Sequence, residues 1–383
     1  MSVEANRERP LSGVRVTERA DTAAGAYAGR LLATLGATVV MLEPPTGSRL
    51  RTAAPWIDGQ DQQSALFAYL GAGKRSLVAD LQTDEGQQLL DQQLSQSDIF
   101  IDDTRLADRA QARISETQIA HRFPELIHVS VLPFGATGDK AHLDAEEINL
   151  VHASGEGFLL PNGYSHELFP DRPPLKIYGQ FANYQGGVVA ALSALSALFS
   201  EAGGQYIDVS VQDAMLLCGA FAIQRLGDGS VEHRATRRFR YGGVMEASDG
   251  FIELLTLEDR QWHGLVELLG SPDWALDPAL SDPLERSVRG DEINAHIRAW
   301  MRLHDVETIV SSAQSLGVPI AQYRTPDDVL HGAHEASRQL FQPTRLADGR
   351  PADLLVAPYR FGLSALGLTS GVPALNEMGL PAT

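Results

Sequence analysis

The sequence predicts an α/β protein with a parallel sheet in a large domain and a smaller α+β domain after residue 227. In the first half, apolar segments of strand length alternate with helical segments, an order typical of βαβ units. After Gly227 the pattern changes to a hairpin followed by successive helices. The 383 residues, 44% of them hydrophobic, can bury sizeable cores in two or three domains.

The first segments are expected to form the sheet. Val14–Thr17 has the pattern of a strand, and Asp21 or Thr22 is placed to cap a helix over Thr22–Leu35, which Gly36 ends. Four more strands are expected before residue 132: Ala37–Leu42, Ser76–Leu81, Asp98–Ile101 and Leu126–Val131. Between them, Asp84–Leu94 is expected to be a helix, and Ser115-Glu-Thr-Gln118 has the capping-box spacing that opens another.

A long stretch rich in loops follows. Residues 132–185 contain scattered Gly, Pro and Asp, and loops of this length are usually functional or contact a partner. A helix is expected from about Tyr184 to Ser200, then a strand at Tyr206–Ser210 and a helix over Asp213–Arg225.

The second part of the chain predicts the smaller domain. Tyr241–Leu257 is typical of a hairpin, with its turn at Ser248-Asp249-Gly250. The elements expected after it are helices Glu258–Leu269, Asp291–Leu303 and Val306–Leu316, strand Val318–Tyr323 and helix Asp327–Leu340. The tail, residues 341–383, is rich in Pro, Gly and Leu and has few helix signals.

Charge and composition exclude several classes of protein. The net charge of −18 and a pI near 5.0 repel nucleic acid and anionic lipid, so neither is an expected partner. Cys218 is the sole cysteine, which excludes an intrachain disulfide and a cysteine-based metal site. The N-terminus lacks the apolar segment of a signal peptide, and the most apolar helix is too short to span a bilayer. We therefore expect a cytoplasmic protein.

Short motifs with known chemistry are mostly absent. Gly71-Ala-Gly-Lys74-Arg75-Ser76 lacks the glycine spacing and the Ser or Thr after lysine that a phosphate loop needs. Lys74 and Arg75 are nevertheless a rare positive pair in an acidic chain, forming either a solvated turn or a phosphate contact. His331-Gly-Ala-His334-Glu335 does not have zinc-site spacing, so no metal is expected.

Ordered landmarks over roughly residues 10–365 resemble one family. They are Leu11–Val16, Ala24–Ala37, Val40–Pro45, Gly73–Leu81, His128–Gly138, Gly179–Gly187, Gly204–Asp213 and Gly317–Pro319. The segment Gly204-Gln205-x-x-Asp208-Val-Ser-Val-Gln-Asp213 is the most specific of them. Their order is similar to that of the class III CoA-transferases (CaiB/BaiF type), which include formyl-CoA transferase, carnitine CoA-transferase and α-methylacyl-CoA racemase.

The resemblance implies a fold and a ligand. The expected fold is a doubly wound, Rossmann-like large domain from both chain ends, 1–227 and 326–383, with the smaller domain, 228–325, between them. Two such chains are expected to interlock as a dimer. Coenzyme A or acyl-CoA is the implied ligand, and carboxylic acids are the implied acceptors. By position, the expected CoA contacts are Thr22, Ala23, Ala24, Lys74, Arg75, Asp103 and Thr104, although the family often has Asn-Phe at the last two.

Residue 183 departs from the family. Class III enzymes carry a nucleophilic aspartate there, which attacks the thioester carbonyl and forms a covalent intermediate. Asn183 has no charge, and its amide nitrogen is a poor nucleophile because its lone pair is delocalised. Glu146 and Glu147 lie where the racemases carry a His-Asp pair. Glu146 is the candidate general base, and Glu147 keeps the place of the family's acid.

Three functions remain open on the sequence. Residues 152–161 and 167–174 resemble two-subunit transferases of aromatic-succinate degradation, and in some hetero-oligomers of the class only one paralogue carries the nucleophile. The chain would then be a non-nucleophilic subunit paired with an Asp-bearing paralogue, instead of a homodimer. Alternatively, it is an active acyl-CoA enzyme of altered mechanism: a transferase by direct acceptor attack, a lyase or an isomerase. The third alternative is a non-enzymatic CoA-binding protein.

Overall fold

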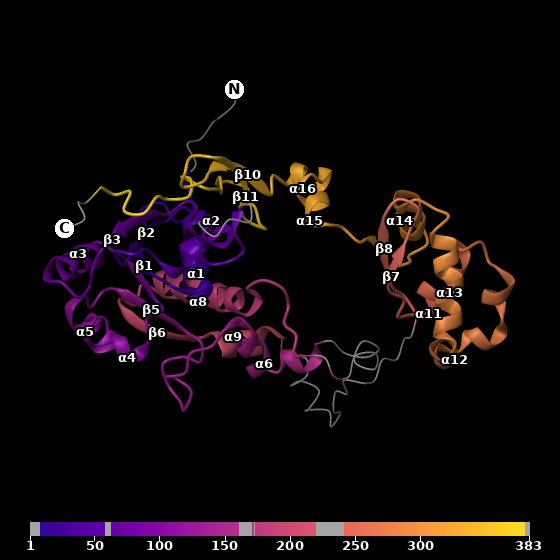
Figure 1. Ribbon diagram of the computed structural model, residues 1–383, viewed down its shortest axis with the longest axis horizontal. Helices are drawn as coiled ribbons and strands as arrows, with labels where there is room; N and C mark the ends of the chain where they lie inside the picture. The colour runs from indigo at the N-terminus through magenta and orange to yellow at the C-terminus, as the bar shows by residue number, and fades with distance from the viewer. Residues whose placement is uncertain (1–7, 58–62, 161–170, 172, 220–240, 380–383) are drawn as a thin grey trace. The chain divides into compact units, whose positions relative to one another are not determined.

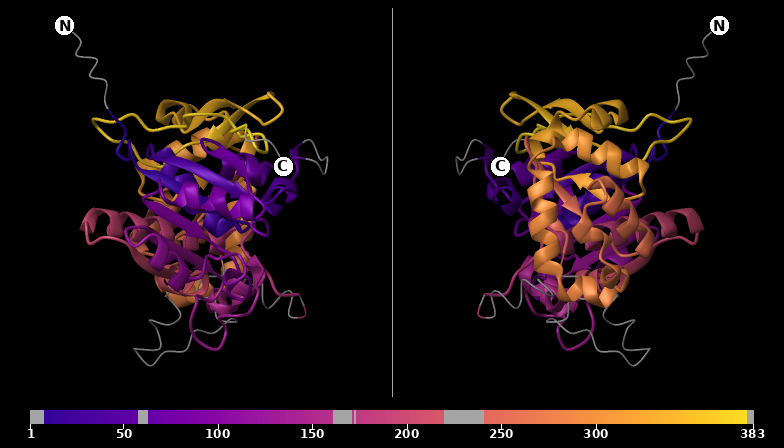
Figure 2. Two further views of the ribbon diagram at one scale, coloured as in Figure 1. Left: turned by 90° about the vertical axis from the view of Figure 1, so that its left-hand side faces the viewer. Right: turned by 90° about the vertical axis from the view of Figure 1, so that its right-hand side faces the viewer.

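The computed structural model describes residues 8–57, 63–160, 171, 173–219 and 241–379. Its contacts divide the chain into two compact units. The larger takes Met1–Leu160, Pro173–Glu232 and Ser337–Thr383, and the smaller takes Pro161–Arg172 and His233–Ala336. Within the larger unit, the C-terminal segment lies beside the N-terminal strands and helices (Figures 1 and 2, yellow beside indigo).

A six-stranded parallel sheet forms the centre of the larger unit. Its strands are β1 (Arg15–Arg19), β2 (Thr38–Glu43), β3 (Arg75–Val78), β4 (Ile99–Asp102), β5 (Ile127–Leu132) and β6 (Gln205–Ser210). The order is β3-β2-β1-β4-β5-β6, and every pair is parallel. The predicted parallel sheet is confirmed. Since the chain first winds outward from β1 to β3 and then returns beside β1, the order reverses between β1 and β4.

Helices accompany this sheet in the larger unit. In chain order they are α1 (Ala23–Thr34), α2 (Ala65–Gly71), α3 (Asp84–Leu94), α4 (Leu106–Arg109), α5 (Glu116–Arg122), α6 (Glu147–Ala153), α8 (Phe181–Ser200) and α9 (Val211–Gly219). Two of them, α1 and α8, position the candidate site. Helices α1 and α8 pack against each other (Figure 1). The absence of a side chain at Gly187 permits this close approach, because a Cβ there would lie only 2.7 Å from the carbonyl oxygen of Ala24.

Several helices differ from the sequence expectation. Helix α8 begins at Phe181, earlier than the expected Tyr184, so Asn183 lies inside its first turn. Helix α6 lies in the stretch expected to be loops, and α2 was not expected. Helix α9 begins at Val211, two residues before the expected Asp213–Arg225 helix, and confirms it up to Gly219; the rest of that expected helix lies outside the described residues.

The C-terminal segment covers one edge of the sheet. It forms the antiparallel hairpin of β10 (Phe341–Arg345) and β11 (Pro351–Leu355). Further along, Met378 N donates to Ser76 O at 3.2 Å, and Val78 N donates to Asn376 Oδ1 at 3.1 Å. The edge strand β3 therefore has hydrogen-bond partners contributed by the end of the chain.

The smaller unit combines a three-stranded antiparallel sheet with helices. Its sheet has the order β7 (Gly243–Glu246), β8 (Phe251–Leu254) and β9 (Ile320–Gln322). Its main helices are α11 (Asp259–Leu268), α12 (Pro283–Val288), α13 (Gly290–Met301) and α14 (Val306–Ser315). The single helix expected over Asp327–Leu340 is two short ones, α15 (Pro326–Leu330) and α16 (Ala333–Arg338). In the described part of the chain, no helix combines the length and apolar character that a membrane span requires.

Candidate functional site

A crevice of about 730 Å³ opens where the strand order reverses. Arg19 ends β1, Asp103 and Thr104 follow β4, and all three line the crevice together with Thr22 at the start of α1. Ligands of doubly wound sheets bind at the carboxyl ends of the strands at this reversal. Its lining also includes the charged residues Asp21, Arg49, Arg105, Asp108, Asp144 and Glu146.

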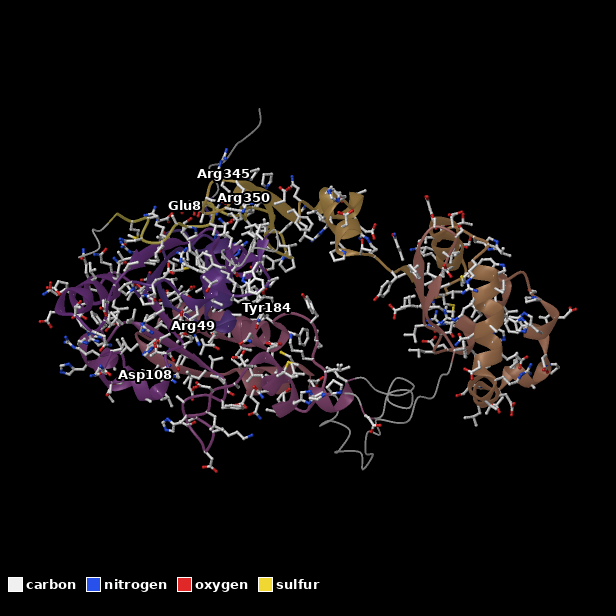
Figure 3. All side chains as sticks on the ribbon, in the orientation of Figure 1. Glu8, Arg49, Asp108, Tyr184, Arg345 and Arg350 are labelled. Carbon is white, nitrogen blue, oxygen red and sulfur yellow. The ribbon has the colours of Figure 1, made fainter. Side chains whose placement is uncertain are left out.

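Three arginines supply the positive charge of the crevice. The Arg19 guanidinium donates to Thr104 Oγ1. Arg105 lies 2.9 Å from Asp108 and 3.6 Å from Asp144, and its side chain is largely exposed. Arg49, the first residue of the short 3₁₀-helix after β2 (labelled in Figure 3), also lines the crevice. Guanidinium groups bind phosphate oxygens in bidentate geometry, so the crevice can hold a phosphorylated ligand in an otherwise acidic protein.

The turn after β1 already binds an anion from the chain itself. Asp21 N donates to the Asp103 carboxylate at 3.0 Å and Thr22 N donates at 2.7 Å. Thr22 Oγ1 accepts from Gly25 N and caps α1. Ala23 and Ala24 are buried, at 4% and 0% exposure. The Thr22 amide, one of the backbone contacts expected for CoA, is therefore donated to Asp103, while Thr22, Asp103 and Thr104 all line the crevice.

Burial raises the pKa of Asp103 to about 6 from its ordinary value of 3.8, although hydrogen bonds from Thr22 and Asp21 lower it. A carboxyl group whose folded pKa is raised contributes stability at low pH that is lost as pH rises through the folded value. Asp103→Asn should remove this dependence. We expect the Tm of the variant minus the Tm of the natural chain to be a few degrees (~5 °C) larger at pH 7 than at pH 4. Thermal unfolding at both values measures this, and a constant difference would contradict it.

Lys74 and Arg75 are adjacent in sequence but have different surroundings. The Lys74 side chain is fully buried, and its Nζ donates to Glu18 Oε1 at 2.9 Å, Glu18 Oε2 at 2.6 Å and Ala26 O at 2.7 Å. Arg75 opens β3 and is exposed. Because the three hydrogens of Lys74 are donated inside the protein, its burial argues against the expected phosphate contact. Neither residue lines the crevice.

Asn183 is held by two acceptors at the N-terminus of α8. Its Nδ2 donates to Glu147 Oε2 at 2.8 Å and to Gln180 Oε1 at 2.9 Å. The buried Glu147 carboxylate also accepts from Ala182 N at 2.6 Å and from Asn183 N at 3.1 Å. These bonds use the backbone donors that a helix leaves free in its first turn, which explains why α8 begins earlier than expected.

The two neighbouring glutamates have different places. Glu146 is exposed, caps α6, and lines the crevice. Glu147 turns inward to Asn183. The sequence singled out Glu146 as the candidate base and gave Glu147 only a structural place, so the direct contact of Glu147 with residue 183 was missed. Sequence spacing carries no signal for it, because the two residues are brought together by the packing of α6 on α8.

The arrangement defines a class of site. It combines a crevice lined by three arginines at a reversal of strand order with the polar start of α8, where Asn183 contacts Glu147, the residue after Glu146 of the crevice lining. The arginines suit an anionic ligand such as one that carries phosphates. Within the described ranges, no group of three or more His, Cys, Asp or Glu side chains is arranged to hold a metal ion.

Comparison with known proteins agrees with this class. The model of CoA-transferase family III matches residues 11–378. Because this match spans nearly the whole chain, the protein belongs to CoA-transferase family III, whose members act on acyl-CoA and carboxylic acids.

Individual relatives cover most of the chain. Succinyl-CoA:mesaconate CoA-transferase of Haloarcula hispanica is 26% identical over 86% of this chain and 84% of its own. Succinate–glutarate CoA-transferase of Agrobacterium fabrum is 27% identical over 97% and 94%. Subunit BbsE of succinyl-CoA:(R)-benzylsuccinate CoA-transferase from Thauera aromatica is 26% identical over 92% and 88%. The crystal structure of a CaiB/BaiF family protein from Brucella suis has a TM-score of 0.83 at 27% identity, covering 97% of this chain and 98% of that one.

Proposed function

We propose that this chain binds CoA or acyl-CoA in the crevice and serves as the non-nucleophilic subunit of a cytoplasmic CoA-transferase, paired with a paralogue that carries aspartate at position 183. The observation that carries the proposal is the engagement of Asn183. Both of its amide hydrogens are donated, to Glu147 and to Gln180, so the side chain offers no anion to a thioester. The similarity to one named subunit of a benzylsuccinate transferase supports the pairing.

The CoA phosphates are assigned to the arginines. Asp103 already accepts from Asp21 N and Thr22 N, so these two amides are not free for a phosphate. Arg49 and Arg105 approach the crevice from two sides, the first after β2 and the second after β4. Thr104, held between Arg19 and Asp102, fixes the wall between them. The acyl end of the ligand would then lie towards Glu146 and the start of α8.

Titration of the purified chain with CoA tests the binding part. We expect Arg49→Ala and Arg105→Ala each to weaken the affinity for CoA by about tenfold, which corresponds to about 1.4 kcal/mol for a lost charged contact. Isothermal calorimetry at fixed salt measures this. Arg302→Ala is a matched control, since Arg302 is exposed and pairs with Glu246 in the smaller unit. Equal affinities for all three variants would contradict the assignment.

A pull-down from the native cell tests the pairing. Co-purification with a similar chain that bears aspartate at the corresponding position supports it, and transferase activity should appear only when both chains are present. Recovery of a homodimer that is inactive but binds CoA would instead favour a non-enzymatic CoA-binding protein.

One observation favours a second function. Glu146 is exposed and lines the crevice, so its carboxylate can reach a bound acyl group as a general base. This would suit a lyase or isomerase acting on acyl-CoA, or a transferase in which the acceptor acid attacks the thioester directly. Turnover of acyl-CoA by the isolated chain that is lost in Glu146→Gln would establish this alternative.

A further inference from the structure

Arg19 is a crevice arginine whose charge is not neutralised by an acid of the described chain. It ends β1, is half-buried and lines the crevice. Its guanidinium donates to the neutral hydroxyl of Thr104, and it takes part in none of the ion pairs formed within the described ranges. Arg105, by contrast, lies 2.9 Å from Asp108 and 3.6 Å from Asp144. A half-buried cation without an acid suits an anion that a ligand supplies.

The acids beside Arg19 are engaged with other partners. Glu18, the preceding residue, pairs with Lys74 at 2.6 Å. Asp21 accepts hydrogen bonds from the turn that follows β2, at 2.7 and 3.0 Å. Asp103 accepts from the amides of the turn after β1, at 3.0 and 2.7 Å. The positive charge of Arg19 therefore remains available to a ligand in the crevice.

The hydroxyl of Thr104 fixes where the Arg19 guanidinium points. Asp102 is fully buried, and its Oδ1 accepts from Thr104 Oγ1 at 2.5 Å and from Thr104 N at 3.0 Å. A carboxylate only accepts hydrogen bonds, so the hydroxyl proton of Thr104 goes to Asp102. The oxygen lone pairs of that hydroxyl are then left to accept from Arg19.

A buried cation completes the support of Thr104. Arg109 is 2% exposed, its Nη2 lies 3.2 Å from Asp102 Oδ2, and its Nε donates to Thr104 O at 2.7 Å. Burial raises the pKa of Asp102, but the neighbouring His128 and Arg109 outweigh this effect and hold the pKa below its ordinary value of 3.8. Asp102 is therefore ionised at neutral pH, and charged groups hold both the backbone and the hydroxyl of Thr104.

We propose that Arg19 binds a phosphate group of the ligand, and that Asp102, acting through Thr104, aims its guanidinium into the crevice. Arg109 is a second positioning residue, because it holds the Thr104 carbonyl and pairs with Asp102. The inference rests on the proposed function, since it names one contact within the same CoA site. A guanidinium that is oriented before binding loses little conformational freedom when the ligand arrives, which favours affinity.

A double-mutant cycle with CoA tests the positioning. We expect Arg19→Ala to weaken the affinity of the purified chain for CoA about tenfold, and Thr104→Val, which keeps the shape but loses the acceptor, about fivefold. The double variant should bind about as weakly as Arg19→Ala alone, because Thr104 acts through a partner that is already absent. Isothermal calorimetry measures all four affinities. Losses that multiply to about 50-fold would overturn the positioning role.

Matched variants separate this role from a general loss of structure. Thr104→Ser keeps the hydroxyl and should recover most of the affinity that Thr104→Val loses. Thr17 is another buried threonine of the sheet, with its Oγ1 2.8 Å from Ser97 Oγ, and it is not part of the crevice lining. Thr17→Val should therefore leave CoA affinity unchanged. A loss equal to that of Thr104→Val would show that any buried hydroxyl of the sheet matters and would contradict the proposal.

Dephospho-CoA identifies which phosphate Arg19 meets. This compound lacks the 3′-phosphate but keeps the diphosphate. An equal effect of Arg19→Ala on CoA and dephospho-CoA assigns Arg19 to the diphosphate, whereas an effect on CoA alone assigns it to the 3′-phosphate. Either result supports the contact, and no effect on either ligand overturns it.

Inorganic pyrophosphate separates this inference from the proposed function. At constant ionic strength and near saturation, it should raise the Tm of the natural chain by about 2 °C and that of Arg19→Ala by less. This result without any binding of CoA would defeat the proposed function and keep the phosphate contact. Binding of CoA that does not change in Arg19→Ala would defeat only the contact.

Discussion

Replacing Lys74 by alanine is expected to lower the free energy of unfolding by about 3–5 kcal/mol, the cost of leaving one partner of a buried ion pair alone. Lys74 and Glu18 are 0% and 2% exposed, and their charged atoms lie 2.6 Å apart. Without the ammonium group, the Glu18 carboxyl remains in apolar surroundings with no cation. Denaturant unfolding of the larger unit at pH 7 measures the loss.

Controls for this prediction come from the same chain. Lys140→Ala removes an exposed lysine and should change stability by no more than about 0.5 kcal/mol. Replacing both members of the pair, Lys74→Met with Glu18→Leu, should recover most of the loss, because apolar side chains of similar volume avoid the desolvation cost. A single variant as stable as the natural chain would show that the pair contributes nothing.

The deficit of Lys74→Ala should also depend on pH. Burial raises the pKa of Glu18 to about 7 from 4.5, even though Lys74 lowers it. Stability linked to a raised carboxyl pKa is present at low pH and lost as pH rises through the folded value. Removing Lys74 takes away the largest interaction that favours the charged form. The deficit should therefore grow from pH 6 to pH 8, and an equal deficit at both would argue against this cause.

The isolated natural chain is expected to exchange CoA between succinyl-CoA and an acid acceptor at least about 10³-fold more slowly than an Asp-bearing relative. Without a carboxylate at position 183, no acyl anhydride and no enzyme-bound CoA thioester can form there. Steady-state exchange, with intact-mass analysis of the chain after incubation with the donor, measures both expectations.

The comparison requires a control for contaminating transferases. A natural chain and an Arg49→Ala variant prepared in parallel should show the same residual rate if that rate comes from contaminants, because the variant weakens only this chain's own CoA site. Ping-pong kinetics with a covalent adduct on the natural chain would reject the non-nucleophilic subunit.

The fold was largely predictable because its signals are local. Each strand of the parallel sheet was predicted from a short apolar run, and the helices α1 and α3 from caps and periodicity. The start of α8 was not, because its first amides are capped by Glu147 from another helix. The C-terminal hairpin was also missed, since its apolar side chains pack against residues of α1, β2 and α2 that are distant in sequence.

The candidate site was predictable only in part for the same reason. Motif order identifies Asn183, and it places Asp103 and Thr104 beside the crevice. It gave no sign that Lys74 is buried against Glu18, 56 residues away in sequence. It also could not show that Asp103 accepts from the Thr22 amide, 81 residues away, which was expected to meet the ligand. Contacts between distant segments decided each of these outcomes.

The docking of the last residues on β3 has a consequence for biogenesis. Asn376 and Met378 hydrogen-bond with Ser76 and Val78, so the outer strand acquires these partners from a segment about 300 residues later in the chain. During translation these groups of the strand stay unpaired until residues 376–378 have been synthesised and have left the ribosome. Unpaired strand edges are where nascent chains associate wrongly. A premature stop codon before residue 376 would make that exposure permanent.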